Sequence, residues 1–524
     1  MTGHDPARAR ALAEALVAIP SVSPDPEGET RCGRALLEAF PERVERGSWR
    51  MRDRREVVWG RLRGAPGGGG ARRAVLVLGH HDTVGVGEFE RLGAPEGEMV
   101  AFQTQRLRDV LEHRASSVGG VSPESVPVLR ADLRSGDDWM LGRGALDMKS
   151  GLAAGVAALD RLARGGSLPG DVLFVSCPDE EHESAGMLEA VDQIARLRGV
   201  EGLELVGALN LDYCGTAIGY AGVMGKRLAG IYVLGCPSHA ATPFEGADAI
   251  QIAAAIVERA TTSAVLAERG EGQVGPPPVA LRLRDLKPGY NAQTAAEAVA
   301  ELNLLSFGRS AEETMTLLRR VVIEALHEAT GRMESLRGPG WVAGWPGGRG
   351  VVLTYPELQE RAGESRASAA EGRPAPGTDA RDATLERVRQ LVRRAELPAP
   401  AVVLYLAPPF HPHIPPGSGP LTTASRTVLA GEDQELRPFY PYISDASYLA
   451  WRAESPESLA RHLPALGREY PLPAAEARAL DLEVVNLGPW GRDAHGLFER
   501  VYAPYAFETL PRLLAEIVRG ALKA

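Results

Sequence analysis

Three short apolar runs, each ending beside polar residues, constrain the fold of this chain more than any other feature. They cover residues 74–80 (AVLVLGH), 171–177 (DVLFVSC) and 205–211 (LVGALNL). Short Val- and Leu-rich runs of this kind are typical of strands buried in a parallel sheet. The stretch 151–162, between the first two runs, has Ala and Leu at helical spacing. Strands that alternate with helices predict an α/β fold with a mostly parallel mixed sheet flanked by helices.

The order of the predicted elements changes after Asp212. A strand, a helix, two strands and a helix follow, over 228–234, 247–266, 279–283, 298–307 and 311–329. This order predicts a smaller α+β domain inserted into the larger one. Residues 361–379 are rich in Ala, Gly, Ser, Pro and charge, which indicates a surface linker.

A helix over 383–395 and a strand over 401–407 then indicate a return to the first domain. We therefore expect a larger domain in two parts, residues 1–214 and 381–524, interrupted by an inserted domain over 215–380. The length of 524 residues supports this division, because a single hydrophobic core rarely grows so large.

The composition excludes several classes of partner. A formal charge of -10, with scattered Lys and Arg, gives no basic surface for nucleic acid. No apolar run reaches the roughly eighteen residues of a membrane span, and the N-terminal residues lack a secretory layout, so we expect a cytoplasmic protein without a membrane partner. The cysteines are far apart and form no CxxC pair, which predicts reduced, mostly buried thiols.

The first apolar run ends in a histidine and an aspartate two residues apart. On an extended strand end, the side chains of His80 and Asp82 point the same way. The carboxylate could then hold one nitrogen of the imidazole while the other nitrogen binds a metal ion. A loop histidine beside a capping aspartate gives the same pattern, so the motif alone leaves both alternatives open.

Carboxylates also lie beside the next predicted helix and strand. Asp147 lies in a glycine-punctuated turn, where it could cap a helix or bridge two cations. Asp179, Glu180 and Glu181 stand side by side after the second run. Their charges repel one another, so one acid could bind a cation while another acts as a general base. A solvated acidic turn is the alternative.

Two further candidates lie in less specific surroundings. Asp212 follows the third run, where an aspartate is usually a turn residue, and His495 lies near the C-terminus, where a histidine is usually packed or solvated. Each of His80, Asp147, Glu181, Asp212 and His495 has such a plain explanation when taken alone. Their joint occurrence at strand ends and adjoining turns predicts one metal-binding site instead.

In this order the residues resemble the M20 family of metallopeptidases and amidohydrolases, over nearly the whole chain. Five strings further resemble the arginine-utilisation branch of that family: YCG (213–215), DLKPGYNAQT (285–294), APPFHPH (407–413), ISDASYL (443–449) and GPWGRDAH (488–495). The resemblance implies a zinc-exopeptidase-like catalytic domain and makes the inserted domain a lid that could also form a homodimer.

The resemblance also implies the metal ligands. His80 and Asp212 would bind one divalent ion, Glu181 and His495 would bind the other, and Asp147 would bridge the two. Zinc suits imidazole and carboxylate ligands, although manganese or cobalt could bind the same residues.

Four other residues receive roles from the resemblance. Asp82 would orient the first histidine. Glu180 would be the general base that takes a proton from a metal-bound water, and the resulting hydroxide would attack an amide carbonyl. His239 matches a lid histidine that stabilises the oxyanion, and Asn291 matches an asparagine that touches the substrate.

The chain departs from the family at two places. Many members carry an Asp-x-Arg motif in a lid strand, whose Arg pairs with the substrate's carboxylate, but this chain has Glu301-Leu302-Asn303. The candidates to replace that cation are Arg282, Arg284, Lys287 and Arg309. In addition, residues 88–138 lengthen the stretch between the first two candidate ligands, and we expect them to reshape substrate access.

We therefore expect a two-metal hydrolase of a small amide, such as an N-acylated amino acid or a short peptide. The link to arginine or ornithine utilisation rests on the resemblance alone. A catalytically silent, metal-dependent binding protein on the same fold is the alternative, but a binder needs no general base and this chain keeps Glu180. A purely structural role, with solvated acids, is a third hypothesis.

Overall fold

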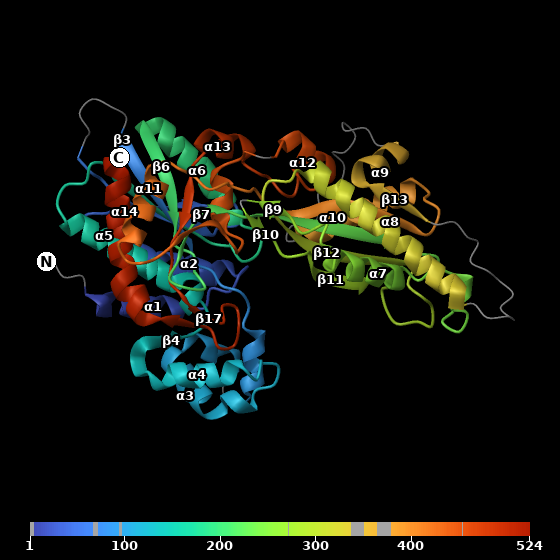
Figure 1. Cartoon of the computed structure of the whole chain (residues 1–524), viewed down its shortest axis with the longest axis horizontal. Helices are drawn as coiled ribbons and strands as arrows, with labels where there is room; N and C mark the ends of the chain where they lie inside the picture. Colours follow the sequence, from blue (N-terminus) through green and yellow to red (C-terminus); the bar gives the residue numbers. More distant parts are fainter. Residues whose placement is uncertain are drawn as a thin grey trace. The chain divides into compact units, whose positions relative to one another are not determined.

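The three apolar runs form neighbouring strands in an eight-stranded sheet. In the computed structural model they are β3 (Arg72–His80), β5 (Asp171–Cys177) and β6 (Leu203–Asn210), and β3 pairs in parallel with the other two. The strand order is β1-β2-β5-β3-β6-β16-β7-β15, and β3, β6 and β7 are labelled in Figure 1. The carboxyl ends of the three strands meet at one edge of the sheet, and the polar residues that follow them meet there too.

The outer strands make this sheet a mixed one. They are β1 (Glu45–Arg50), β2 (Glu56–Leu62), β7 (Gly219–Val223), β15 (Leu436–Tyr440) and β16 (Val484–Asn486). β16 pairs in parallel with β6, and β15 pairs in parallel with β7, whereas β1-β2, β2-β5 and β16-β7 are antiparallel. The predicted α/β class with a mostly parallel mixed sheet is confirmed.

The structure describes residues 5–65, 72–93, 97–270, 272–336, 350–363, 379–452 and 454–524. They form two compact units. The first is Met1–Val223, Ile414–Trp451 and Ala475–Ala524, and the second is Met224–His413 and Arg452–Ala474.

Helices flank the large sheet and complete its core. They are α1 (Pro6–Val17), α2 (Pro26–Ala39), α5 (Ser150–Arg164), α6 (Ala185–Glu201), α11 (Pro420–Ala430), α13 (Ala474–Leu480) and α14 (Leu510–Lys523). Alternate strand residues such as Val75, Val77 and Phe174 join α2, α5, α11 and α14 in one apolar cluster. α1 and α2 both begin with Asp-Pro, in which the aspartate caps the helix and the proline fixes its first turn.

The predicted insertion over 88–138 is helical and has a core of its own. It contains α3 (Thr104–Arg114) and α4 (Ser125–Arg134), together with short turns over 87–92 and 98–102 (Figure 1). Its apolar cluster includes Phe89, Leu107 and Leu129, and also takes in Leu497 and Phe498 from the C-terminal part of the chain.

A three-stranded sheet follows this insertion. β4 (Trp139–Leu141) pairs with β18 (Arg500–Tyr502), which pairs with β17 (Gly491–Arg492), and both pairings are antiparallel. The loop between β17 and β18 carries His495. Two distant parts of the sequence therefore meet beside the ends of the central strands.

The second unit contains the predicted α+β pattern. Its sheet has the order β11-β12-β8-β14-β13, with β8 (Gly225–Leu234), β11 (Val279–Asp285), β12 (Glu297–Ser306), β13 (Val351–Thr354) and β14 (Ala401–His411). Its helices are α7 (Ala249–Thr261), α8 (Ala311–Leu336), α9 (Tyr355–Arg361), α10 (Ala380–Arg394) and α12 (Pro456–His462), and a short hairpin joins β9 (Arg269–Gly270) to β10 (Gln273–Val274).

Three segments lie in a different unit from the one expected, namely residues 215–223, 381–413 and 452–474. α10 and β14 were predicted to return to the first domain, but β14 pairs antiparallel with β8 in the second unit. A fully buried apolar run fits either sheet, so its sequence does not select the partner strand. β7 lies beyond the expected boundary at 214, yet it pairs with β15 and β16 of the first unit. Most of the predicted linker over 361–379 lies outside the described residues.

The structure also bears on the cysteines and on membranes. Cys32, Cys177 and Cys214 are buried and Cys236 is partly buried, and all four are unpaired thiols. In the part of the chain that the structure describes, no helix is long and apolar enough to cross a bilayer.

A glycine sets the distance between α5 and the end of β6. A Cβ atom on Gly151 would lie 2.3 Å from the backbone oxygen of Leu211. Because this neighbour is backbone, we expect Gly151→Ala to separate the helix from the strand and to destabilise the protein by about 1–3 kcal/mol. The urea-unfolding midpoint, followed by circular dichroism, measures the effect.

The matched control is Gly199→Ala in α6, where a Cβ would meet nothing within 4 Å. There the same substitution should stabilise the helix by up to about 0.5–1 kcal/mol. Equal midpoints for the two variants would contradict the proposed close approach at Gly151.

Candidate metal centre

His80 and Asp82 lie at the carboxyl end of β3, as predicted. Both side chains are buried, and His80 Nδ1 lies 3.4 Å from Asp82 Oδ1. The other carboxylate oxygen of Asp82 accepts a hydrogen bond from the backbone N–H of Glu181 at 3.0 Å. One aspartate therefore contacts both the histidine and the acidic turn that follows the neighbouring strand.

Asp147 projects from the turn that precedes α5. Its Oδ1 lies 3.1 Å from His80 Nε2, and its Oδ2 lies 2.9 Å from His495 Nε2. Behind it, the carboxylate of Glu499 accepts hydrogen bonds from the backbone N–H groups of Leu146 and Asp147. Each oxygen of Asp147 thus faces a different imidazole, which is the placement that a bridging ligand requires.

The three carboxylates of the acidic turn after β5 point in different directions. Glu181 Oε1 lies 3.0 Å from His495 Nε2, and Glu180 lies with Glu181 beside His80. Asp179 turns away: its carboxylate pairs with Arg55 at 2.5 Å and accepts a hydrogen bond from Ala185 N–H at the start of α6. The turn is therefore not a solvated acidic loop.

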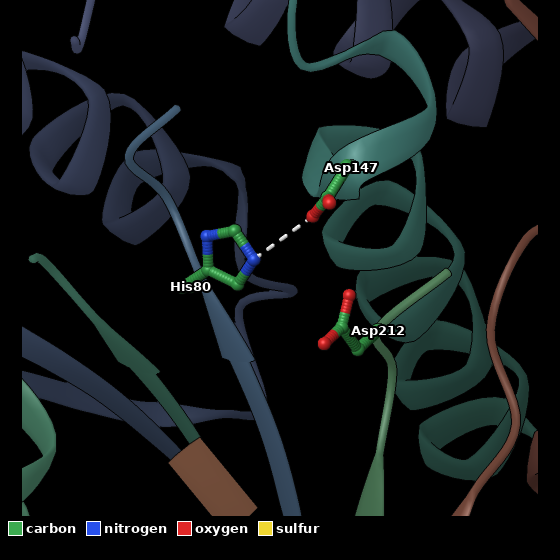
Figure 2. Close-up of side chains that lie close together, drawn as sticks. All are labelled: His80, Asp147 and Asp212. Carbon is green, nitrogen blue, oxygen red and sulfur yellow. Dashed lines mark hydrogen bonds and ion pairs between the residues drawn. The ribbon is translucent and has the colours of Figure 1, made fainter. Parts of the chain in front are cut away.

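Asp212 follows β6 and faces the same space as His80 and Asp147. Figure 2 shows these three side chains, which come from two strand ends and a turn and point toward one another. Asp212 is buried, and its Oδ1 accepts a hydrogen bond from Tyr213 N–H, which fixes the direction of the carboxylate.

The six side chains form overlapping groups that could each hold an ion. In each group the candidate ligand atoms lie within 4.8 Å of one another. One group is His80, Asp147 and Asp212, a second is Asp147, Glu181 and His495, and a third is His80, Glu180 and Glu181. The first two share Asp147 and together contain every ligand predicted from the sequence.

Burial and like charge perturb the protonation of these groups. Burial and neighbouring carboxylates raise the pKa of Glu180 and of Asp212 well above the usual range. Although burial lowers the pKa of His495, hydrogen bonds to Asp147 and Glu181 raise it to about 11. Several carboxylates this close need positive charge among them, which protons or cations supply.

The donor set fits two divalent cations. Asp147, Glu181 and Asp212 provide carboxylate oxygens, and His80 and His495 each direct Nε2 toward Asp147. Imidazole with carboxylate is a donor mixture that suits zinc, manganese or cobalt. The second nitrogen of His80 faces Asp82, which is the arrangement that holds a metal-binding imidazole in one orientation.

A buried network of charged side chains supports the acidic turn. Arg55 pairs with Asp179, with Glu29 of α2 at 2.9 Å and with Asp53 at 2.6 Å. Ser23 donates hydrogen bonds to the same Glu29 and Asp179 carboxylates. One guanidinium therefore offsets the charge of Asp179, the first acid of the DEE triplet, and links the turn to a helix and to the loop between β1 and β2.

His239 and Asn291 lie in the second unit, in neighbouring loops. His239 pairs with Gln293 in an isolated antiparallel bridge, and Asn291 Oδ1 accepts a hydrogen bond from Gln293 N–H. The backbone N–H of Ala241 donates to His239 Nδ1 at 3.0 Å, so Nε2 is the nitrogen that can carry the proton of the neutral ring.

The cations considered as replacements for the missing arginine differ in their surroundings. Arg282 pairs with Glu301 and Asp382, and Arg284 pairs with the same Asp382. Lys287 instead donates its Nζ to the backbone oxygen of Gln293 at 3.0 Å, beside the two loops just described. Lys287 is thus the candidate that lies beside the loops of His239 and Asn291.

Sequence reasoning missed the charged residues that support the centre. Arg55, Arg143, Arg500 and Glu499 are all buried, and three of them touch a ligand or its turn. Glu499 and Arg500 lie four and five residues after His495, and that spacing was the available signal. Arginines rarely become fully buried without a partner, but a single sequence does not show which arginines are buried.

Comparisons with known proteins show the family of this chain. The sequence matches the Peptidase family M20/M25/M40 over residues 123–459. The Bacillus subtilis protein YqjN is 32% identical over 483 residues, covering 86% of this chain and 84% of YqjN. The chain belongs to the M20 family.

Two further known proteins are similar to this chain, one in sequence and one in structure. The Bacillus subtilis protein RocB is 28% identical over 481 residues, covering 86% of this chain and 82% of RocB. The solved structure of the aminopeptidase PepT from Bacillus cereus matches with a TM-score of 0.54 at 12% identity, covering 99% of both chains. The M20 resemblance, including the likeness to RocB, is confirmed, and membership of this peptidase family makes the chain a hydrolase.

Proposed function

We propose that this M20 protein hydrolyses the amide bond of a small substrate, such as an N-acylated amino acid or a short peptide, with the help of two divalent ions. The observation that carries the proposal is the pair of donor groups that share Asp147. His80 and Asp212 would complete one site, and Glu181 and His495 would complete the other. The bound ions would polarise the scissile carbonyl and lower the pKa of a water molecule.

Glu180 is the proposed general base. It lies with Glu181 beside His80, yet it belongs to neither of the two groups that share Asp147. A carboxylate that is not a ligand of either ion can accept the proton of the attacking water and return it to the leaving amine. Asp82 would act through His80, by holding the imidazole in one orientation.

His239 is the proposed oxyanion donor. The hydrogen bond from Ala241 N–H occupies Nδ1, which leaves Nε2–H as the donor for negative charge that develops on the carbonyl oxygen. Asn291, in the neighbouring loop, would hold the substrate by hydrogen bonds.

Glu180→Gln should reduce kcat by about 10²–10⁴-fold, because the amide has nearly the same shape but cannot accept the proton. Metal content should stay at the wild-type level. Both are measured on zinc-loaded protein, the first with a panel of N-acyl amino acids and dipeptides and the second by elemental analysis. Arginine and ornithine derivatives come first in the panel, because of the resemblance to the arginine-utilisation branch.

The control is Glu204→Gln, which changes an exposed glutamate of β6 and should leave both quantities unchanged. Equal rates for the wild type and Glu180→Gln would refute the assignment of the base. Tight binding of a panel compound with no turnover, at full metal occupancy, would instead support the silent binding protein.

We further propose that Lys287 binds the free carboxylate of the substrate in place of the missing strand arginine. An ion-assisted hydrogen bond contributes about 1.5–3 kcal/mol, so Lys287→Met should raise KM by roughly ten- to a hundredfold with kcat little changed. The effect should be absent for substrates whose carboxylate is amidated. Arg284→Met, which removes a cation paired with Asp382, is the matched control, and an equal effect in both variants would contradict the proposal.

We also propose that the second unit forms a homodimer through β11. This strand lies at one end of its sheet and exposes Val279, Leu281 and Leu283, by 49%, 60% and 41%. An exposed apolar edge strand favours pairing with a second copy. Leu281→Lys should convert the dimer to monomer in sedimentation velocity, whereas Val265→Lys, at an equally exposed valine outside the strand, should not. A monomeric wild type would refute this proposal.

A further inference from the structure

His495 lies in a loop whose backbone needs support. Residues 493–499 connect β17 to β18, and both Asp493 (φ 57) and His495 (φ 62) have the left-handed conformation that favours glycine. Other residues keep it only where the surroundings hold them in place. The His495 side chain is 46% exposed, so little packing fixes its imidazole directly. Apart from its contacts with Asp147 and Glu181, the position of this imidazole therefore depends on what anchors the loop.

Arg500 forms hydrogen bonds with both ends of this loop. Its Nη1 donates to Asp493 Oδ2 at 2.5 Å and to the backbone oxygen of Phe498 at 2.8 Å. The guanidinium is fully buried and lies 5.4 Å from the centre of the Trp139 ring. A buried guanidinium is stable only with an anionic partner, and Asp493 faces one side of it.

The insertion supplies the partner on the other side. Asp132 of α4 accepts hydrogen bonds at Oδ2 from Arg500 Nε at 2.8 Å and from Arg500 Nη2 at 2.6 Å. The same oxygen lies 3.3 Å from Arg492 Nε, at the start of the loop. One carboxylate from residues 88–138 thus contacts both strands that carry the loop.

Two more contacts join the insertion to the loop. Arg143 pairs with Glu88, at the start of the insertion, and donates to the backbone oxygen of His495 at 3.2 Å. Leu497 and Phe498, two and three residues after the histidine, are buried in the apolar cluster of the insertion. The insertion therefore holds the loop both through hydrogen bonds and ion pairs and through apolar packing.

We propose that residues 88–138 are a positioning element for His495, with Asp132 as its polar anchor. This inference rests on the proposed two-metal site. Loosening the anchor should weaken chiefly the ion held by Asp147, Glu181 and His495, because His495 is the ligand side chain that the loop carries and the other group does not contain it. The ion held by the other group should bind as before. Asp132 would be a positioning residue, since it touches no proposed ligand side chain.

The experiment is a calorimetric titration of Zn²⁺ into chelator-stripped full-length protein. Asp132→Asn keeps the shape of the side chain but removes its charge, and Arg500→Lys keeps the charge but cannot reach Asp132 and both ends of the loop. In each variant we expect one of two binding steps to weaken by about 10–100-fold while the other stays within about twofold. A second titration with Co²⁺, followed by its absorption spectrum, reports the change in ligands.

The control is Glu112→Gln in α3 of the same insertion. Glu112 is half-exposed, and among the described residues its only ion pair is with Arg108. It should bind both ions as the wild type does. Thermal unfolding of the metal-free variants separates a local effect from a loss of fold.

The outcomes separate this inference from the proposed function. A wild type that binds fewer than two ions would overturn the two-metal site and the inference with it. If the wild type binds two ions and both Asp132→Asn and Arg500→Lys also do so with wild-type affinity, only the inference fails. Equal weakening of both steps, with a matching loss of thermal stability, would also overturn it, because the insertion would then stabilise the whole unit rather than one ligand.

Discussion

Electrostatic repulsion among buried carboxylates is the constraint on which the rest of the first unit depends. Asp147, Glu180, Glu181 and Asp212 lie around two imidazoles, and burial raises the cost of every unpaired charge. The sheet brings them together because the carboxyl ends of its central strands share one edge. Such an arrangement needs positive charge from protons or cations, and the donor atoms are grouped so that two divalent ions could supply it.

The same constraint explains the buried arginines around the centre. Arg55 offsets Glu29 and Asp179, Arg143 offsets Glu88 and Glu499, and Arg500 offsets Asp132 and Asp493. Each guanidinium pairs with two or more acids from segments that are far apart in sequence. The carboxylates around the centre are therefore paired with arginines, whereas burial and neighbouring carboxylates raise the pKa values of Glu180 and Asp212, which face the ligand space. Removing one of these arginines would leave buried acids unpaired, which typically costs about 3–5 kcal/mol.

Much of this could be predicted from the sequence, because strands buried on both faces and their polar ends have a local signature. Ala74 to His80 needed no partner to be predicted as a strand. β14 was assigned to the wrong unit because its apolar run is equally suited to either sheet, and strand pairing is a long-range property. The contact of Asp132 with Arg500 spans 368 residues and involves two ordinary surface-type side chains, so no local pattern indicates it. Insertions are therefore better interpreted from the contacts of their charged residues than from their length.

The proposed role of Lys287 in the second unit would change how the substrate is selected without changing the chemistry. Where the family resemblance places an arginine in the lid strand, β12 carries Asn303, and Glu301, two residues before it, pairs with the nearby Arg282, which also pairs with Asp382. Asn303 is neutral and the charge of Glu301 is offset by Arg282, so these two positions offer no cation for a carboxylate. A lysine beside the loops of His239 and Asn291 would bind the same group as a point charge rather than as a planar fork. Such a contact tolerates more variation in the angle of the carboxylate, and specificity would then depend more on the remainder of the substrate.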